Sequence, residues 1–216
     1  MMGLEARDNR TGTVPGYDVE RIRADFPILY REVHGKPLVY LDNGASAQKP
    51  RQVLEAMDHA YRFEYANVHR GLHTLSNAAT AKFEDAREIT RRFLNAGSVD
   101  EIVFTRNATS AINLVAQCYG GLVIGEGDEI VLSIMEHHAN IVPWHYHRER
   151  KGAVLKWAPM DDTGELLIDE FERLLTSRTK IVAITHMSNV LGTVTPIREI
   201  IRIAHAHGVP VLVDGS

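Results

Sequence analysis

The feature that most constrains this chain is a regular alternation of apolar strands and amphipathic helices after residue 100. The strand segments are short runs rich in Val, Ile and Leu, and most are followed by a segment with helical spacing. We expect strands at 101–105, 129–133, 154–157, 180–184 and 209–213, and helices at 108–119, 141–150, 169–175 and 196–205. Near-continuous apolar runs are typical of parallel strands buried on both faces. The sequence therefore predicts an α/β fold, with a mostly parallel sheet covered by helices on both faces.

The first hundred residues have a less regular pattern. We expect a disordered leader over 1–17, an N-terminal helical segment over 18–30, and one large domain over 31–216. Short segments are predicted within these limits: a strand at 37–41, and a helix from Ala78 to Leu94 that Ser76 caps.

The charge, apolar runs and cysteine content of the chain limit its possible partners and its cellular setting. The net charge of −4 gives no reason to expect nucleic acid or an anionic membrane as a partner. No apolar run approaches the roughly 18 residues that a membrane-spanning helix needs. Cys118 is the only cysteine, so the chain can form no internal disulfide, which fits a reducing, cytoplasmic setting. We expect its thiol to be buried and inert.

Polar residues gather where four of the predicted strands end. In an open α/β sheet, the carboxyl edge of the strands is where ligands bind. After the first strand, a helix start near Thr109 can bind an anion, although a simple cap by Asn107 or Thr109 explains the same residues. After the last strand, Asp214 is either a helix cap or a carboxylate that pairs with a pyridinium nitrogen.

The two clusters between them also allow two interpretations. His137 follows the second strand and can stack on a planar ligand, or it can join His138, His145 and His147 in a metal site. Asn189 follows the fourth strand and suits either a tight turn or a hydrogen bond to a ligand oxygen.

We expect no metal in this chain. The spacings of the histidines around residue 140 match no standard zinc pattern, and one cysteine lends no support. His69 and His73 have the spacing of two metal ligands on a helix, but Gly71 between them favours a loop.

Together these segments are similar to the SUF-type cysteine desulfurases, a branch of the class V aminotransferases with the type I fold of pyridoxal-phosphate (PLP) enzymes. The resemblance covers residues 19–216, and the run at 136–144 separates this branch from the housekeeping iron–sulfur branch. The segments that carry it are Arg23-Ala-Asp-Phe-Pro27, Tyr40-Leu-Asp-Asn-Gly-Ala-Ser-Ala-Gln-Lys-Pro50, His69-Arg-Gly-Leu-His-Thr-Leu-Ser76, Glu136-His-His-Ala-Asn-Ile-Val-Pro-Trp144 and Ser188-Asn-Val-Leu-Gly192.

The resemblance implies a role for each candidate residue. Ala108 and Thr109 would hold the PLP phosphate, His137 would stack on the ring, Asn189 would bond the ring hydroxyl oxygen, Asp214 would pair with the ring nitrogen, and His69 and Arg70 would lie near the active-site mouth and the dimer contact. The chain departs from the family at Asn107-Ala108, where Gly-Thr is more usual, and this costs one possible hydroxyl contact.

The implied activity converts L-cysteine to L-alanine and leaves persulfide sulfur on a homodimeric enzyme, for transfer to a sulfur-acceptor protein of iron–sulfur cluster assembly. The resemblance places both the Schiff-base lysine and the persulfide cysteine beyond Ser216. The chain is then the N-terminal half of such an enzyme, a partial large domain without the C-terminal strands and the small domain. It is expected to be inactive alone because the lysine and the cysteine are absent. Two alternatives stay open: a non-catalytic remnant or dimerisation fragment, and a related enzyme such as a selenocysteine lyase.

Overall fold

The computed structural model describes residues 17–216, so nearly all of the expected disordered leader lies outside the described residues. The described part of the chain divides into two compact units, one up to residue 102 and one from 103 to 216. The boundaries predicted at residues 17 and 30 stay predictions.

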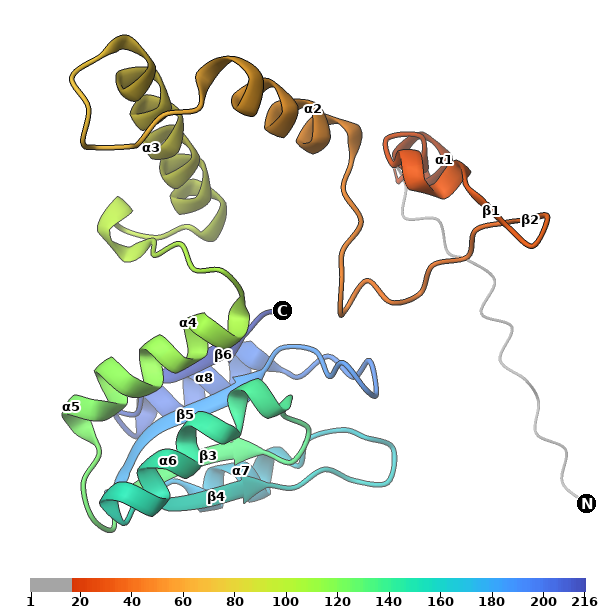
Figure 1. Cartoon of the computed structure of the whole chain (residues 1–216). Coiled ribbons are helices and arrows are strands. Elements are labelled where there is room, and N and C mark those ends of the chain that lie inside the picture. The colour runs from red at the N-terminus through yellow and green to blue at the C-terminus, as the bar shows by residue number, and fades with distance from the viewer. Residues whose placement is uncertain (1–16) are drawn as a thin grey trace, which may run out of the picture. The chain divides into compact units, whose positions relative to one another are not determined.

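The first unit is mostly helical (Figure 1). Its elements are α1 (Val19–Arg23), the 3-10 helix η1 (Pro27–Tyr30), β1 (Glu32–Val33), β2 (Lys36–Pro37), α2 (Arg51–His59), the π-helix η2 (Ala60–Glu64), α3 (Thr74–Leu94) and the 3-10 helix η3 (Val99–Glu101). Asp18 caps α1 by accepting the Arg21 N–H at 3.0 Å. The predicted strand at 37–41 is wrong, since only Lys36–Pro37 pairs, with β1, across a turn that holds His34 and Gly35 at positive φ.

The start of α3 differs from the prediction. The helix begins at Thr74, and His73 rather than Ser76 is its N-cap. Ser76 lies fully buried in the first turn, where its hydroxyl donates to the Asn67 carbonyl at 2.7 Å and accepts the Gly71 N–H at 3.0 Å. Ser76 therefore fastens the preceding loop to the helix instead of capping it.

The second unit is a parallel sheet between two layers of helices (Figure 1). Its strands run in the order β4-β3-β5-β6, and every pairing is parallel. The elements are α4 (Ala108–Val115), the π-helix η4 (Ala116–Gly120), α5 (Gly121–Val123), β3 (Glu129–Ser133), the 3-10 helix η5 (His138–Asn140), α6 (Val142–Lys151), β4 (Val154–Ala158), α7 (Ile168–Leu174), β5 (Thr179–Thr185), α8 (Ile197–Ala206) and β6 (Val211–Asp214).

Four of the five predicted strands are confirmed, and the first is wrong. Glu101 ends η3, and residues 102–105 join no ladder in the described part of the chain. Val103 and Phe104 are 63% and 44% exposed. An apolar run can be extended, but it becomes a strand only when a neighbour takes its backbone N–H and C=O groups.

The core consists of two apolar layers, one on each face of the sheet. Side chains alternate between faces along a strand. Val131 and Val182 therefore pack with Phe171 of α7 and residues of α8, whereas Leu132 packs on the other face with Trp144 of α6. The prediction of helices on both faces is confirmed.

Candidate functional site

The first turn of α4 presents free backbone donors. Asn107 is extended and caps the helix, because its Oδ1 accepts the Ser110 N–H at 2.8 Å. Ala108 and Thr109 follow as the first two helical residues, and both are exposed. Backbone N–H groups in a first turn have no helical acceptor, so these two can bind an anion. The cap and the anion site are thus compatible.

His137 lies in the loop that follows β3, with an exposed ring. Its Nδ1 accepts the Ala139 N–H at 3.1 Å, so in the neutral ring the proton is on Nε2. The rings of His137 and His138 are 6.2 Å apart and tilted by 41°. The η5 helix that begins just after His137 is in contact with α4. The fold therefore brings the His137 loop beside the helix that starts at Ala108.

The carboxyl of Glu136 fixes this loop, and the sequence analysis did not single it out. It is buried, and accepts from Ser133 Oγ at 2.5 Å, the Thr185 N–H at 2.9 Å and Asn140 Nδ2 at 2.7 Å. Burial raises the pKa of Glu136, and the charge of nearby Asp214 acts in the same direction. An acidic residue three positions after a buried strand is the signal that could have identified it.

Asp214 ends β6 as a buried carboxylate. Its Oδ1 accepts the N–H and the hydroxyl of Ser216, at 3.1 and 2.7 Å, while Oδ2 makes no hydrogen bond to any residue within 17–216. Its carbonyl accepts the His186 N–H at 2.8 Å, and Thr185 is its register partner on β5. One carboxylate oxygen thus remains available at the carboxyl edge.

Asn189 lies in the loop between β5 and α8. Residues 189–191 form a turn, Gly192 has a φ of 74°, and Met187 bridges Val194 across the loop. The tight turn predicted here is confirmed. The Asn189 side chain is exposed and forms no hydrogen bond with the residues that the structure describes, so it is free to contact a ligand.

His69 and Arg70 belong to the first unit, in the loop before α3, as Gly71 indicated. His69 has a φ of 61°, donates its backbone N–H to Thr80 Oγ1 at 2.9 Å, and pairs through Nε2 with Glu84 at 2.8 Å. The loop is therefore held in a defined conformation. Its position relative to the sheet of the second unit stays a prediction.

Three further expectations concern the cysteine, metal binding and membrane-spanning helices. Cys118 is exposed on the π-helix η4, so the expectation of a buried thiol is wrong. The buried residues of this segment are Ala116 and Gly120, and residues two apart on a helix do not share a face. Between residues 17 and 216, no three potential ligands gather as a metal site would need. In the same range, no helix combines the length and apolar character that crossing a bilayer requires.

Comparison with known proteins places these features in a family. Residues 39–216 match the aminotransferase class V family model. A cysteine desulfurase of Klebsiella pneumoniae is 53% identical over 93% of this chain. The solved cysteine desulfurase of Thermococcus onnurineus is 37% identical, with a TM-score of 0.84 over 92% of this chain, and that of Escherichia coli is 38% identical, with a TM-score of 0.78 over 92%. The chain spans 49%, 47% and 49% of the lengths of these three proteins.

Proposed function

This chain belongs to the aminotransferase class V family, and we propose that it supplies the PLP-binding part of a cysteine desulfurase. The enzyme would convert L-cysteine to L-alanine and hold the released sulfur as a persulfide. The chain spans about half the length of its relatives. We therefore propose this activity for the full-length product of the gene, which is called the gene-length protein from here on. The observation that carries the proposal is the convergence of the α4 start, the His137 loop and Asp214 at one edge of the sheet.

The donor and acceptor set at this edge fits PLP. The free N–H groups of Ala108 and Thr109 can bind a phosphate, and the free Oδ2 of buried Asp214 can hold a proton on the pyridine nitrogen. The exposed ring of His137 can stack on the cofactor, and Asn189 can donate to a ring oxygen. When bound, PLP supplies an electron sink for negative charge that develops on the substrate carbon.

The other parts of the proposal follow from the resemblance to the SUF-type branch. The protein would be a cytoplasmic homodimer, with His69 and Arg70 at the active-site mouth, and would pass sulfur to an acceptor of iron–sulfur cluster assembly. The Schiff-base lysine and the persulfide cysteine would lie beyond Ser216. Exposed Cys118 does not match the position of the persulfide cysteine.

His137→Ala in the gene-length protein tests the proposal. We expect a shifted absorbance band of bound PLP and alanine production lowered by about a hundredfold or more, since the ring would no longer contact the cofactor. His138→Ala is the matched control, because His138 is the exposed neighbour with no proposed contact, and should leave both properties unchanged. An unchanged spectrum and rate in His137→Ala would contradict the proposal. Parallel assays with L-cysteine and L-selenocysteine separate the desulfurase from a selenocysteine lyase.

A further inference from the structure

One buried carboxyl joins three elements at the carboxyl edge of the sheet. Glu136 accepts from Ser133 at the end of β3, from the backbone of Thr185 at the end of β5, and from Asn140 in η5. Asn140 in turn accepts the indole N–H of Trp144 at 3.1 Å. Asn140 and Trp144 are fully buried, and Glu136 is 7% exposed.

Two of these donors cannot reverse their direction. The Thr185 N–H lies beyond the last β3–β5 register pair, Leu132–Ala183, and can only donate. The indole N–H of Trp144 can also only donate, so Asn140 must turn its oxygen to Trp144 and its NH2 to Glu136. Both oxygens of Glu136 therefore have to accept a hydrogen bond.

This arrangement requires a carboxyl group and excludes an amide. A glutamine would place its NH2 against either the Thr185 N–H or the Asn140 NH2, and neither can change roles. A carboxyl fits in both protonation states, because the Ser133 hydroxyl can donate to the carboxylate or accept from the acid.

The choice of a carboxyl carries a cost in stability. Burial disfavours the ionised form and raises the pKa of Glu136, and the negative charge of nearby Asp214 adds to this. A buried acid with a raised pKa makes folding less favourable as the pH rises through its ordinary value. Such conflicts between local chemistry and stability are typical of functional sites.

We propose that Glu136 is a positioning residue, which holds the His137 loop against the end of β5 so that the His137 ring faces the ligand bound at this edge. The ring itself has one fixed contact, from the Ala139 N–H to Nδ1, within the loop. The bonds of Glu136 to Thr185 and Asn140 connect that loop to the sheet and to α6. The role of His137 rests on the proposed function, whereas the attachment of the loop by Glu136 does not.

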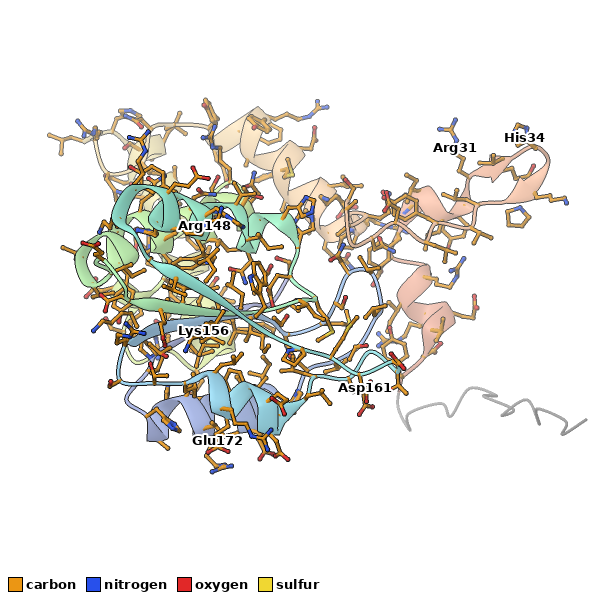
Figure 2. All side chains as sticks on the ribbon, turned by 90° about the horizontal axis from the view of Figure 1, so that it is seen from below. Arg31, His34, Arg148, Lys156, Asp161 and Glu172 are labelled. Atoms are coloured by element: carbon orange, nitrogen blue, oxygen red, sulfur yellow. The ribbon has the colours of Figure 1, made fainter. Side chains whose placement is uncertain are left out.

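Glu136→Gln in the gene-length protein tests this proposal with a matched control. Glu129→Gln makes the same change at a buried carboxyl at the opposite end of β3, where Glu129 binds Thr176, Thr179 and Lys156 of the neighbouring segments. Lys156 is labelled in Figure 2, on β4. Both variants lose a buried carboxylate, but only Glu136→Gln detaches the His137 loop.

The first measurement is amide hydrogen exchange in the apo protein. We expect exchange of residues 134–141 to increase about tenfold or more in Glu136→Gln, and to stay unchanged in Glu129→Gln. A tenfold change corresponds to the loss of about one hydrogen bond. Ser133→Ala removes one reversible donor and is a milder variant, in case Glu136→Gln does not fold. Ser133→Ala should also increase the hydrogen exchange of residues 134–141, but by a smaller factor than Glu136→Gln.

The second measurement is the absorbance and the dissociation constant of bound PLP. We expect Glu136→Gln to shift the absorbance band of PLP and to weaken PLP binding about tenfold. Glu129→Gln should lower the melting temperature by a similar amount, but should change neither the band nor the affinity for PLP. Unchanged exchange at 134–141 in both Glu136→Gln and Ser133→Ala overturns the proposal, as does an unshifted PLP band once exchange has increased. If the wild-type protein binds no PLP, the proposed function fails, and the exchange result alone supports or overturns the attachment by Glu136.

Discussion

Gly120 lies against the Nε2 edge of the His147 ring. A Cβ atom at Gly120 would be 2.9 Å from Nε2 of His147, which binds the Ala116 carbonyl at 2.7 Å. His147 is 1% exposed, and Gly120 and Ala116 belong to the π-helix η4. The absence of a side chain at residue 120 lets His147 of α6 come close enough to η4 to bind this carbonyl.

Gly120→Ala should therefore destabilise the protein by about 1–3 kcal/mol, because the added methyl group overpacks the contact with His147. Gly121→Ala is the control, since both glycines have helical φ and a Cβ at Gly121 would meet nothing within 4 Å. That variant should gain about 0.4–1 kcal/mol through a less flexible unfolded chain. Thermal unfolding of the two gene-length variants measures the difference, and equal midpoints would contradict the close contact.

The second prediction concerns the pH dependence of Glu129, on β3. Burial raises the pKa of this carboxyl, but hydrogen bonds from Lys156, Thr176 and Thr179 outweigh burial and lower it below 4.5. A lowered pKa gives stability that is present above pH 4.5 and is lost as the pH falls through the folded value. Glu129→Gln should lose about 1–3 kcal/mol at pH 7.

The loss caused by Glu129→Gln should shrink as the pH falls below 4.5. Urea unfolding of wild type and variant at a series of pH values measures this difference. A loss that is the same at pH 7 and pH 3.5 would show that the pKa of Glu129 is not lowered in the folded protein.

The third prediction concerns Asp214. If its free Oδ2 keeps a proton on the cofactor nitrogen, Asp214→Asn in the gene-length protein should lower turnover about a hundredfold or more, and weaken PLP binding far less. Ser216→Ala removes one hydrogen bond to Oδ1 and keeps the carboxylate, so its turnover should fall by less. Turnover of Asp214→Asn within a fewfold of wild type would contradict the role.

The sequence was most informative where one periodicity dominates. The buried runs of β3 and β5 and the amphipathic helix α8 were predicted within a few residues, because burial on both faces leaves an unbroken apolar signal. The strand predicted at 101–105 failed for the opposite reason. Its residues have strand propensity, but pairing is a property of a neighbour that local sequence does not reveal.

The residues of the candidate site also differ in how well the sequence could indicate them. Asp214 and His137 could be found because each polar residue follows an apolar strand. The position of Glu136 three residues after an apolar strand marks it as a candidate, but the sequence does not reveal its partners. These are Thr185, 49 residues away, and Asn140, whose orientation the indole N–H of Trp144 fixes. The outward position of Cys118 was missed because its apolar neighbours suggested burial, although residues two apart on a helix, such as Cys118 and buried Ala116, do not share a face.

The last prediction is that the isolated chain from Met1 to Ser216 produces no alanine or sulfide from L-cysteine, even with added PLP. The resemblance places the Schiff-base lysine and the persulfide cysteine beyond Ser216, and exposed Cys118 lies on a helix away from the carboxyl edge. The isolated chain should also aggregate, because β6 pairs only with β5 among the described residues and leaves one edge of the ladder open. Light scattering and a sulfide assay, with the gene-length protein as the active control, measure both properties. A monodisperse 216-residue protein that melts cooperatively and releases sulfide would show that the catalytic groups lie within this chain.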